Sequence, residues 1–438
     1  MTFRTLRPFG KISLVLLFVW HWTQPAGTAE APATNAIDQY NGIHTALHDS
    51  HAAGDWAANL RAAKDFKAFT HGAPNSLLEA ARADVHLGDL PAAMSELQQF
   101  VRMGQANDIL LTSPDFATLR QQPEFTDIAK RMKDNASPST LATAAFALKD
   151  TDLLPEDIDY DPSSKRFFIT SVLERKIISA DAQGVTRDFV RSPNHWPMLA
   201  IKVDATHKKV WATEVALQGL AVVPKKDWGR SGLLCFDLKT AKLLTRVEGP
   251  HGSALGDMTL SPAGDVIISD GAAGGVYRLP VGTKTLQRLD NGDFVSPQTP
   301  VLLPDGNRLF VPDYARGIAI LDISTKHVTW LSLDGRFAVI GIDGLYLNNQ
   351  TLLAVQNGTS PERVTAFTMD DALTKIVAEK TIERATTTLG DPTHGLVVGS
   401  DFYYIANSGW NTLDDHGATT PAAKRTPAQI MRAPIPTP

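Results

Sequence analysis

The chain has 438 residues, with 42 basic and 47 acidic side chains and a formal net charge of −5 at pH 7. This balance provides no basic field for a phosphate backbone, so nucleic-acid binding is not expected. The length suits two domains, and the single cysteine, Cys235, excludes an intramolecular disulfide framework.

The first 31 residues have the pattern of a secretory signal peptide. Basic residues from Arg4 to Lys11 precede an apolar run over Ile12–Trp20, and small residues follow. We predict cleavage after Ala29 or Ala31, and hence export to the periplasm or secretion. The alternative is an uncleaved N-terminal anchor, but the apolar run is shorter than the roughly 20 residues that span a bilayer. No later segment reaches that length, so no membrane span is expected after cleavage.

Residues 36–134 are predicted to form an all-α domain. Apolar positions recur at helical spacing in four segments, namely Ile37–His51, Trp56–Phe69, Ser76–Leu87 and Ala92–Met103. The Gly-Asp pairs at 54–55 and 88–89 recur at about the 34-residue period of a tetratricopeptide repeat, which this domain resembles. Such helices could bind a partner protein in a concave groove or could dock on the domain that follows, and both interpretations stay open.

Residues 135–438 are predicted to form an all-β, six-bladed propeller. In residues 297–323 an apolar run, a Pro-Asp-Gly turn, a second strand and a glycine turn lead to a third strand. Similar copies recur at intervals of roughly 40 to 60 residues, as expected for propeller blades, and they begin at Pro155, Pro197, Leu255, Gly341 and Asp391. A β-sandwich with coincidental turn spacing is the alternative, but it would not return to the same turn chemistry.

Segment 141–148, which follows a linker at Asn135–Thr140, is predicted to close the ring of blades. Such a ring exposes two sheet edges unless a strand from one end pairs with a strand from the other. We therefore expect 141–148 and the last strand, 429–435, to lie in the same sixth blade.

Polar residues just before each innermost strand are expected to line one mouth of the central channel. From blade one to blade six they are Glu156 and Asp157, Trp196, Asp257, Gln298 and Thr299, Asp343, and Thr393 and His394. Carboxylates, an amide and an imidazole around one mouth suit a hard divalent cation, with calcium as the first choice and zinc or manganese as alternatives. Each residue also has an ordinary structural interpretation, because Asp-Gly and Gly-Asp are common turn pairs, and Asn357-Gly358 is predicted to be such a turn. Ligand specificity would come from mouth loops such as Gly219–Gly232 and Thr412–Pro427.

The blade pattern and these positions resemble the senescence-marker-protein, gluconolactonase and luciferin-regenerating-enzyme family, whose six-bladed propellers hold one divalent metal and often hydrolyse lactones. Glu156, in Pro-Glu-Asp-Ile-Asp-Tyr-Asp, matches the first-blade glutamate ligand of that family. Asp343, in Ile-Asp-Gly-Leu-Tyr-Leu, matches its fifth-blade carboxylate. The chain departs from the family where Gly256-Asp257 and Gln298-Thr299 replace pairs that contain asparagine.

The resemblance implies metal ligands at Glu156, Asp343 and Gln298. It also implies a metal-dependent lactone hydrolase in which Asp343 or Asp257 accepts a proton from water, with help from His394. The alternative is a non-catalytic envelope propeller that binds a partner protein or a small sugar-like ligand at its mouth.

Overall fold

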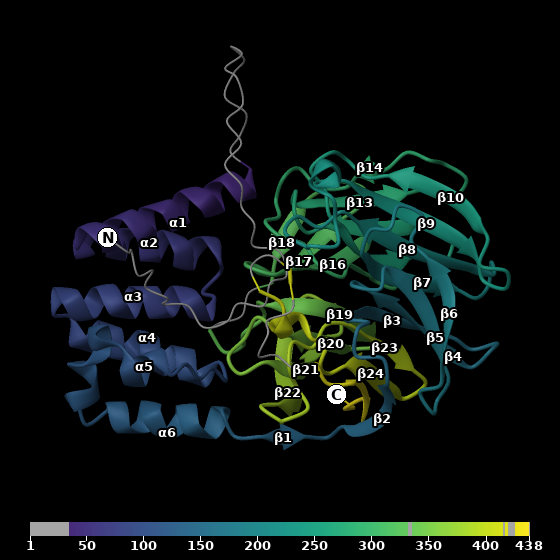
Figure 1. The fold of residues 1–438 in the computed structure, drawn as a ribbon. Coiled ribbons are helices and arrows are strands. Elements are labelled where there is room, and N and C mark those ends of the chain that lie inside the picture. Colours follow the sequence, from purple (N-terminus) through teal and green to yellow (C-terminus); the bar gives the residue numbers. More distant parts are fainter. Residues whose placement is uncertain (1–34, 332–334, 415–416, 419–424, 438) are drawn as a thin grey trace, which may run out of the picture.

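The computed structural model describes residues 35–331, 335–414, 417–418 and 425–437 of the chain. A stack of helices lies beside a ring of β-sheets (Figure 1), so the chain combines a helical part with a six-bladed β-propeller, as the sequence predicts. The predicted signal peptide at residues 1–31 lies outside the described residues. Within the described ranges, no helix is both long enough and apolar enough to cross a membrane.

The first helices begin and end where the sequence has its Gly-Asp pairs. Gly54 and Gly88 follow two helix C-termini with φ angles of 66° and 83°, the left-handed region that glycine adopts most readily. Asp55 and Asp89 then cap the next helices by accepting hydrogen bonds from backbone N–H groups of the first turn. The helices are α1 (Ala36–Ala53), α2 (Trp56–Phe69), α3 (Pro74–Leu87), α4 (Leu90–Arg102), α5 (Ile109–Thr112) and α6 (Phe125–Asn135), with short 3-10 turns η1 (Pro114–Phe116) and η2 (Leu119–Gln121).

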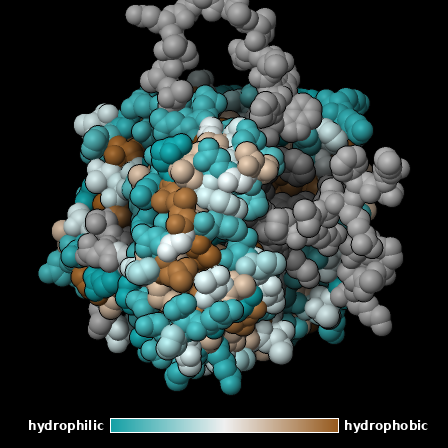
Figure 2. Space-filling view, turned by 90° about the vertical axis from the view of Figure 1, so that its left-hand side faces the viewer, coloured by the Kyte–Doolittle hydropathy of each residue, from teal (hydrophilic) through white to brown (hydrophobic). Residues whose placement is uncertain are grey.

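Helices α1 to α4 pack against one another in chain order (Figure 1), and a core that includes Leu77, Leu97 and Phe100 lies among the later helices. The tetratricopeptide assignment itself stays a prediction. On the face that the helices present to solvent, apolar side chains gather in a stripe near the middle of a largely hydrophilic surface (Figure 2). Leu87 and Leu111 are the most exposed of the large apolar side chains described in this part, at 47% and 45%.

Six antiparallel sheets form the propeller, and the first strand of each blade lies innermost, where it contacts the first strands of neighbouring blades. The strands of the first three blades are β3 (Pro155–Asp161), β4 (Arg166–Ser171), β5 (Lys176–Ala180) and β6 (Thr186–Arg191); β7 (Met198–Asp204), β8 (Lys209–Val215), β9 (Ser231–Asp237) and β10 (Leu243–Glu248); and β11 (Leu255–Leu260), β12 (Val266–Asp270), β13 (Gly275–Leu279) and β14 (Gln287–Arg288). Those of the last three are β15 (Val301–Leu302), β16 (Arg308–Asp313), β17 (Gly317–Asp322) and β18 (Val328–Trp330); β19 (Ile342–Asn348), β20 (Thr351–Gln356), β21 (Arg363–Met369) and β22 (Ile376–Arg384); and β23 (Gly395–Val398), β24 (Asp401–Ile405), β25 (Ala428–Pro434) and β2 (Thr143–Leu148).

Apolar residues on both faces of each sheet hold neighbouring blades together. In β4, Phe167 and Ile169 pack toward blade six, whereas Phe168 packs toward blade two, because successive side chains of a strand point to opposite faces. Cys235 is buried in the same way between blades two and three, and burial raises the pKa of its thiol to about 11. The core is therefore a ring of apolar layers, one between each pair of adjacent blades.

The ring closes in blade six, where β2 pairs antiparallel with β25. A sheet edge that would otherwise be open is thus covered by a strand from the other end of the propeller. The segment expected to be a plain linker, Asn135–Thr140, is partly structured instead. Asn135 ends α6, and the short strand β1 (Ser139–Thr140) adds to the outer edge of blade five. Two paired residues leave no periodic pattern, so sequence reasoning does not detect this strand.

The helical part docks on the propeller through arginine side chains. Arg316, between β16 and β17, lies against the rings of Phe69 and Trp330, with its guanidinium carbon 4.1 and 4.3 Å from their centroids. Arg363, at the start of β21, is buried and donates to the backbone oxygens of Met103 and Ala338. The helices therefore pack on turns of blades four and five, as the docking interpretation expects. Binding of a partner protein by the helices stays a prediction.

Candidate metal centre

Four ionisable side chains from four blades meet at one end of the channel. Glu156, Asp257 and Asp343 lie near the starts of the innermost strands β3, β11 and β19, and His394 directly precedes β23. All four are buried, with at most 6% of any of them exposed. The convergence follows from the ring, since equivalent positions of successive blades surround the same axis.

The strands are irregular where they carry the acidic residues. The pairing of each innermost strand with its neighbour shifts register there, between Pro155 and Ile158, between Leu255 and Met258, and between Ile342 and Gly344. Such bulges interrupt the ladder of hydrogen bonds and re-aim side chains, and they are common beside functional sites.

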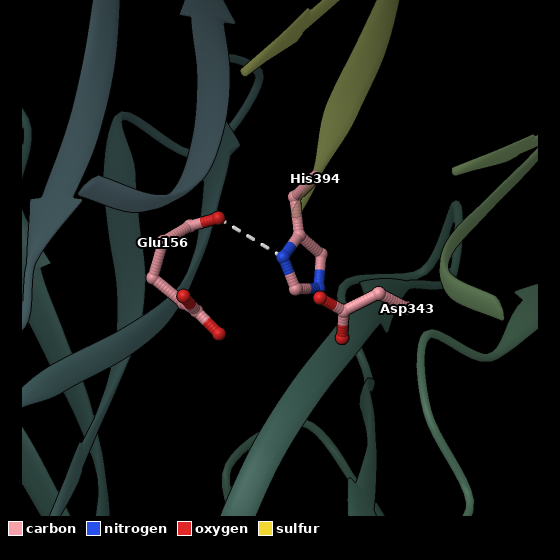
Figure 3. Close-up of side chains that lie close together, drawn as sticks. All are labelled: Glu156, Asp343 and His394. Carbon is pink, nitrogen blue, oxygen red and sulfur yellow. Dashed lines mark hydrogen bonds between the residues drawn. The ribbon is translucent and has the colours of Figure 1, made fainter. Parts of the chain in front are cut away.

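The ligand atoms of Glu156, Asp343 and His394 all lie within 4.8 Å of one another. The two carboxylates face each other across a gap, with the imidazole ring beside it (Figure 3). Glu156 Oε2 accepts a hydrogen bond from Trp410 Nε1 at 2.6 Å, and Asp343 Oδ2 accepts one from Asn357 Nδ2 at 2.8 Å. Among the described residues, no hydrogen bond reaches the other carboxylate oxygens, Glu156 Oε1 and Asp343 Oδ1. One oxygen of each carboxylate is thus available to a ligand.

Both ring nitrogens of His394 already have partners. Nδ1 lies 3.0 Å from the backbone oxygen of Glu156, and Nε2 lies 2.9 Å from Asp257 Oδ1. Burial lowers the pKa of His394, but the charges of Asp257 and Asp157 more than offset this, so the pKa lies well above its ordinary value. A ring that donates from both nitrogens is an imidazolium, which cannot bind a metal. In this arrangement Glu156 and Asp343 are therefore the members that offer ligand atoms.

Burial also changes the proton affinity of the two carboxylates. It raises the pKa of Glu156 to about 8, and the negative charge of Asp343 adds to the rise, whereas His394 opposes it. Burial likewise raises the pKa of Asp343 to about 7, against the charge of His394 and the hydrogen bond from Asn357. A divalent cation between them would replace the bound protons and remove the repulsion. The donor set, two buried carboxylates with one available oxygen each, therefore fits a metal ion.

Two other predicted mouth residues, Asp157 and Thr299, have structural partners. Asp157 Oδ2 accepts from the backbone N–H of Ile201 and from Lys202 Nζ, at 2.8 and 3.0 Å, which joins blades one and two. Thr299 Oγ1 donates to the backbone oxygen of Asp343 at 3.0 Å. Thr393 Oγ1 is buried and has no hydrogen-bond partner within the described ranges.

The side chains of Gln298 and Trp196, the two remaining predicted mouth residues, make their contacts outside the group of four ionisable side chains. Gln298 Nε2 donates to the backbone oxygen and to Oγ of Ser296, at 3.2 and 3.0 Å, so its part as a metal ligand stays a prediction. Trp196 packs in an apolar cluster above blade two, and its indole N–H lies 3.4 Å from Asp227 Oδ2. An indole nitrogen offers no lone pair to a cation, so Trp196 contributes apolar surface instead.

Sequence reasoning missed two residues that hold the carboxylates. Asn357 was expected to be only a turn residue, but its amide bonds Asp343 and accepts from the hydroxyl of Tyr314 at 2.9 Å. Trp410, in η4 (Trp410–Thr412), comes from the long connection of blade six, which has no counterpart in the repeat. The one sequence signal available for Asn357 is its place in the polar turn directly after the second strand of blade five.

No family model matches the sequence, and none of the curated proteins matches it. Among solved structures, the chain is similar to a PQQ-bound aldose sugar dehydrogenase from Streptomyces coelicolor, with 12% identity, a TM-score of 0.46, and 68% of this chain and 98% of that chain covered. It is also similar to a gluconolactonase from Xanthomonas campestris, with 14% identity, a TM-score of 0.45, and coverage of 66% and 89%. A luciferin-regenerating enzyme gives 12% identity, a TM-score of 0.45, and coverage of 68% and 99%. At these identities the likeness concerns the fold alone.

Proposed function

We propose that the protein binds one divalent cation between Glu156 and Asp343 and hydrolyses lactones. The observation that carries the proposal is the pair of buried carboxylates with one available oxygen each, in a cluster whose ligand atoms lie within 4.8 Å of one another. Calcium is the first candidate, because carboxylate oxygens are hard ligands, and zinc or manganese are alternatives. When bound, the cation would supply a Lewis acid that polarises a carbonyl group.

Asp257 and His394 are the side chains that would handle the proton. His394 Nε2 is hydrogen-bonded to Asp257 Oδ1 at 2.9 Å, and the other ring nitrogen, Nδ1, is hydrogen-bonded to the backbone oxygen of Glu156. The second carboxylate oxygen, Asp257 Oδ2, has no hydrogen-bond partner among the residues described. A proton taken from water would therefore be held on Asp257 Oδ2, next to the ring that fixes the carboxylate.

A panel of lactones, assayed with the metal added and removed, tests this function. We expect turnover that depends on the metal, and a fall in kcat of about 10²-fold or more in Asp257→Asn, because a general base contributes 10²–10⁴-fold. Asp257→Asn should still gain thermal stability from the metal, since Glu156 and Asp343 remain. Turnover of no lactone by a protein that binds metal would contradict the hydrolase and favour a second function.

That second function is a non-catalytic propeller that binds a partner protein or a small ligand. It is supported by the burial of Glu156, Asp343 and His394, since none of the three is more than 4% exposed. A substrate reaches these side chains only if the covering loops move. We further propose that the chain is exported, to the periplasm or beyond the cell, on the pattern of its first 31 residues. Mass measurement of exported protein that begins at Met1 would contradict cleavage.

A further inference from the structure

Two blades carry long connections at the end of the channel where the acidic cluster lies. The connection from β8 to β9 runs from Val215 to Ser231, and the connection from β24 to β25 runs from Ile405 to Ala428. The equivalent connections of blades one, three and four are short turns, at 172–175, 271–274 and 314–316. The long connections are therefore additions to the repeat at one side of the mouth.

The described parts of these connections meet over blades one to three. Their apolar side chains form one buried cluster with residues next to the site, and we call its six central members the cap: Leu154, Trp196, Leu220, Val223, Trp410 and Leu413. The backbone of Gly417 lies directly on Leu220, since a Cβ at Gly417 would come within 2.6 Å of Leu220 Cα. The cap is thus a packed layer that joins both connections.

The cap is in direct contact with the acidic cluster. Trp410 donates its indole N–H to Glu156 Oε2 at 2.6 Å, and Leu154 comes just before the strand that carries Glu156. Ala254, also part of this apolar layer, directly precedes the strand that carries Asp257. A ligand that reaches Glu156 therefore lies next to the apolar side chains of the cap.

The polar atoms of the cap are already used. The indole N–H of Trp410 bonds Glu156, and that of Trp196 lies 3.4 Å from Asp227. The remaining side chains of the cap are aliphatic, so ring hydroxyls placed against them would lose their hydrogen bonds to water without replacement. An apolar ligand body would instead replace the contacts that the cap makes with itself.

We propose that this site takes a cyclic carbonyl compound with an apolar body, such as an aromatic or alkyl-substituted lactone, in preference to a polyhydroxylated sugar lactone. This inference rests on the proposed function, because it names the substrate class of the same site. The carbonyl oxygen lies toward Glu156 and Asp343, and the apolar body lies against Leu220, Trp410 and Leu413.

Binding of two lactams, which are not hydrolysed as lactones are, tests the inference apart from turnover. Dihydroquinolin-2-one has an aromatic body and gluconolactam has a polyhydroxylated one. Titration calorimetry on the full chain, with calcium added, should give a Kd at least tenfold lower for the aromatic lactam. Equal or tighter binding of gluconolactam, or binding of neither, would overturn the inference.

A matched pair of variants locates the preference. Leu220→Asn should weaken binding of the aromatic lactam about tenfold, because it places a polar amide against an apolar ligand. Leu244→Asn, on the outer strand β10 where the side chain is 47% exposed, should leave it unchanged. Equal affinities in the two variants would contradict the assignment of the cap. Lactam binding without lactone turnover would contradict the proposed function but leave this inference intact.

Discussion

Glu362 shows how a single half-buried carboxyl group joins two blades. It lies in the turn between β20 and β21, and its Oε2 accepts the backbone N–H of Asp391, which precedes blade six, at 2.9 Å. Burial raises the pKa of Glu362 to about 8, and the charge of Asp391 adds to the rise. In the folded protein this carboxyl group therefore keeps a proton at pH values where an unfolded chain has lost it.

This raised pKa predicts a pH-dependent stability. The stabilising contribution is present at low pH and is lost as the pH rises through about 8, because the folded state binds the proton more tightly than the unfolded state. The side chain of Glu362→Gln cannot ionise, so the variant does not lose this contribution. Its free energy of unfolding, relative to that of the wild type, should therefore rise by about 1 kcal/mol between pH 6 and pH 9. Urea unfolding at both pH values measures this difference. The exposed Glu124→Gln serves as the control, and an unchanged difference for Glu362→Gln would contradict the prediction.

At the level of residues, the sequence predicted the members of the site but not what holds them. Glu156, Asp257, Asp343 and His394 occupy equivalent places in four of the six blades, which is the signal that predicts them, and the structure brings all four together. Trp410 could not be found in this way, because it belongs to a connection without a counterpart in the repeat. Trp196 occupies the equivalent place in blade two, but its side chain packs in the cap against residues of the added connection of that blade.

Among the elements, β2 is the strand that closes the ring of blades. It pairs with β25 and places Leu148, with 0% exposed, in the apolar layer between blades six and one. Sequence reasoning could foresee this strand because an open ring has two unpaired edges. It could not foresee β1, since two residues at the edge of blade five follow no period.

A leucine pair tests the contribution of β2. Leu148→Ala should lower the free energy of unfolding by about 2–5 kcal/mol, the usual cost of removing a buried leucine. Leu141→Ala, just before β2 with 42% of the side chain exposed, should change it by less than about 0.5 kcal/mol. Chemical denaturation of both variants provides the comparison. Equal losses would mean that β2 does not carry the closure of the ring.

The whole molecule is a propeller with a helical part fixed to one side of it, and the described parts of the connections of blades two and six pack together over blades one to three. Arg316 links the two parts, because it lies between Phe69 and Trp330 and its Nε donates to the backbone oxygen of Phe69 at 3.2 Å. The sequence predicted two kinds of structure in the right order, since helical and strand periods differ clearly. It could not predict how they pack, because Arg316 and Trp330 become neighbours of Phe69 only through the fold.

Docking through Arg316 predicts that both parts unfold together. Arg316→Ala removes the guanidinium from between two rings, so the helical part should unfold separately and at lower temperature than the propeller. Differential scanning calorimetry should then show two transitions in place of one. Arg131→Ala, an exposed arginine of α6, should keep the wild-type profile. A single transition at the wild-type midpoint in Arg316→Ala would contradict this role.

The central claim is that Glu156 and Asp343 hold a divalent cation, and thermal unfolding of the chelator-treated full chain tests it most directly. Calcium, manganese and zinc are titrated in turn to millimolar concentration. An ion at a hundredfold its Kd adds about 2.7 kcal/mol, so at least one of them should raise the unfolding midpoint by several degrees. Glu156→Gln and Asp343→Asn should each abolish the rise, and Asp108→Asn, an exposed carboxylate of the helical part, should keep it. A wild-type midpoint that none of the three ions changes, or an equal rise in both ligand variants, would contradict the account.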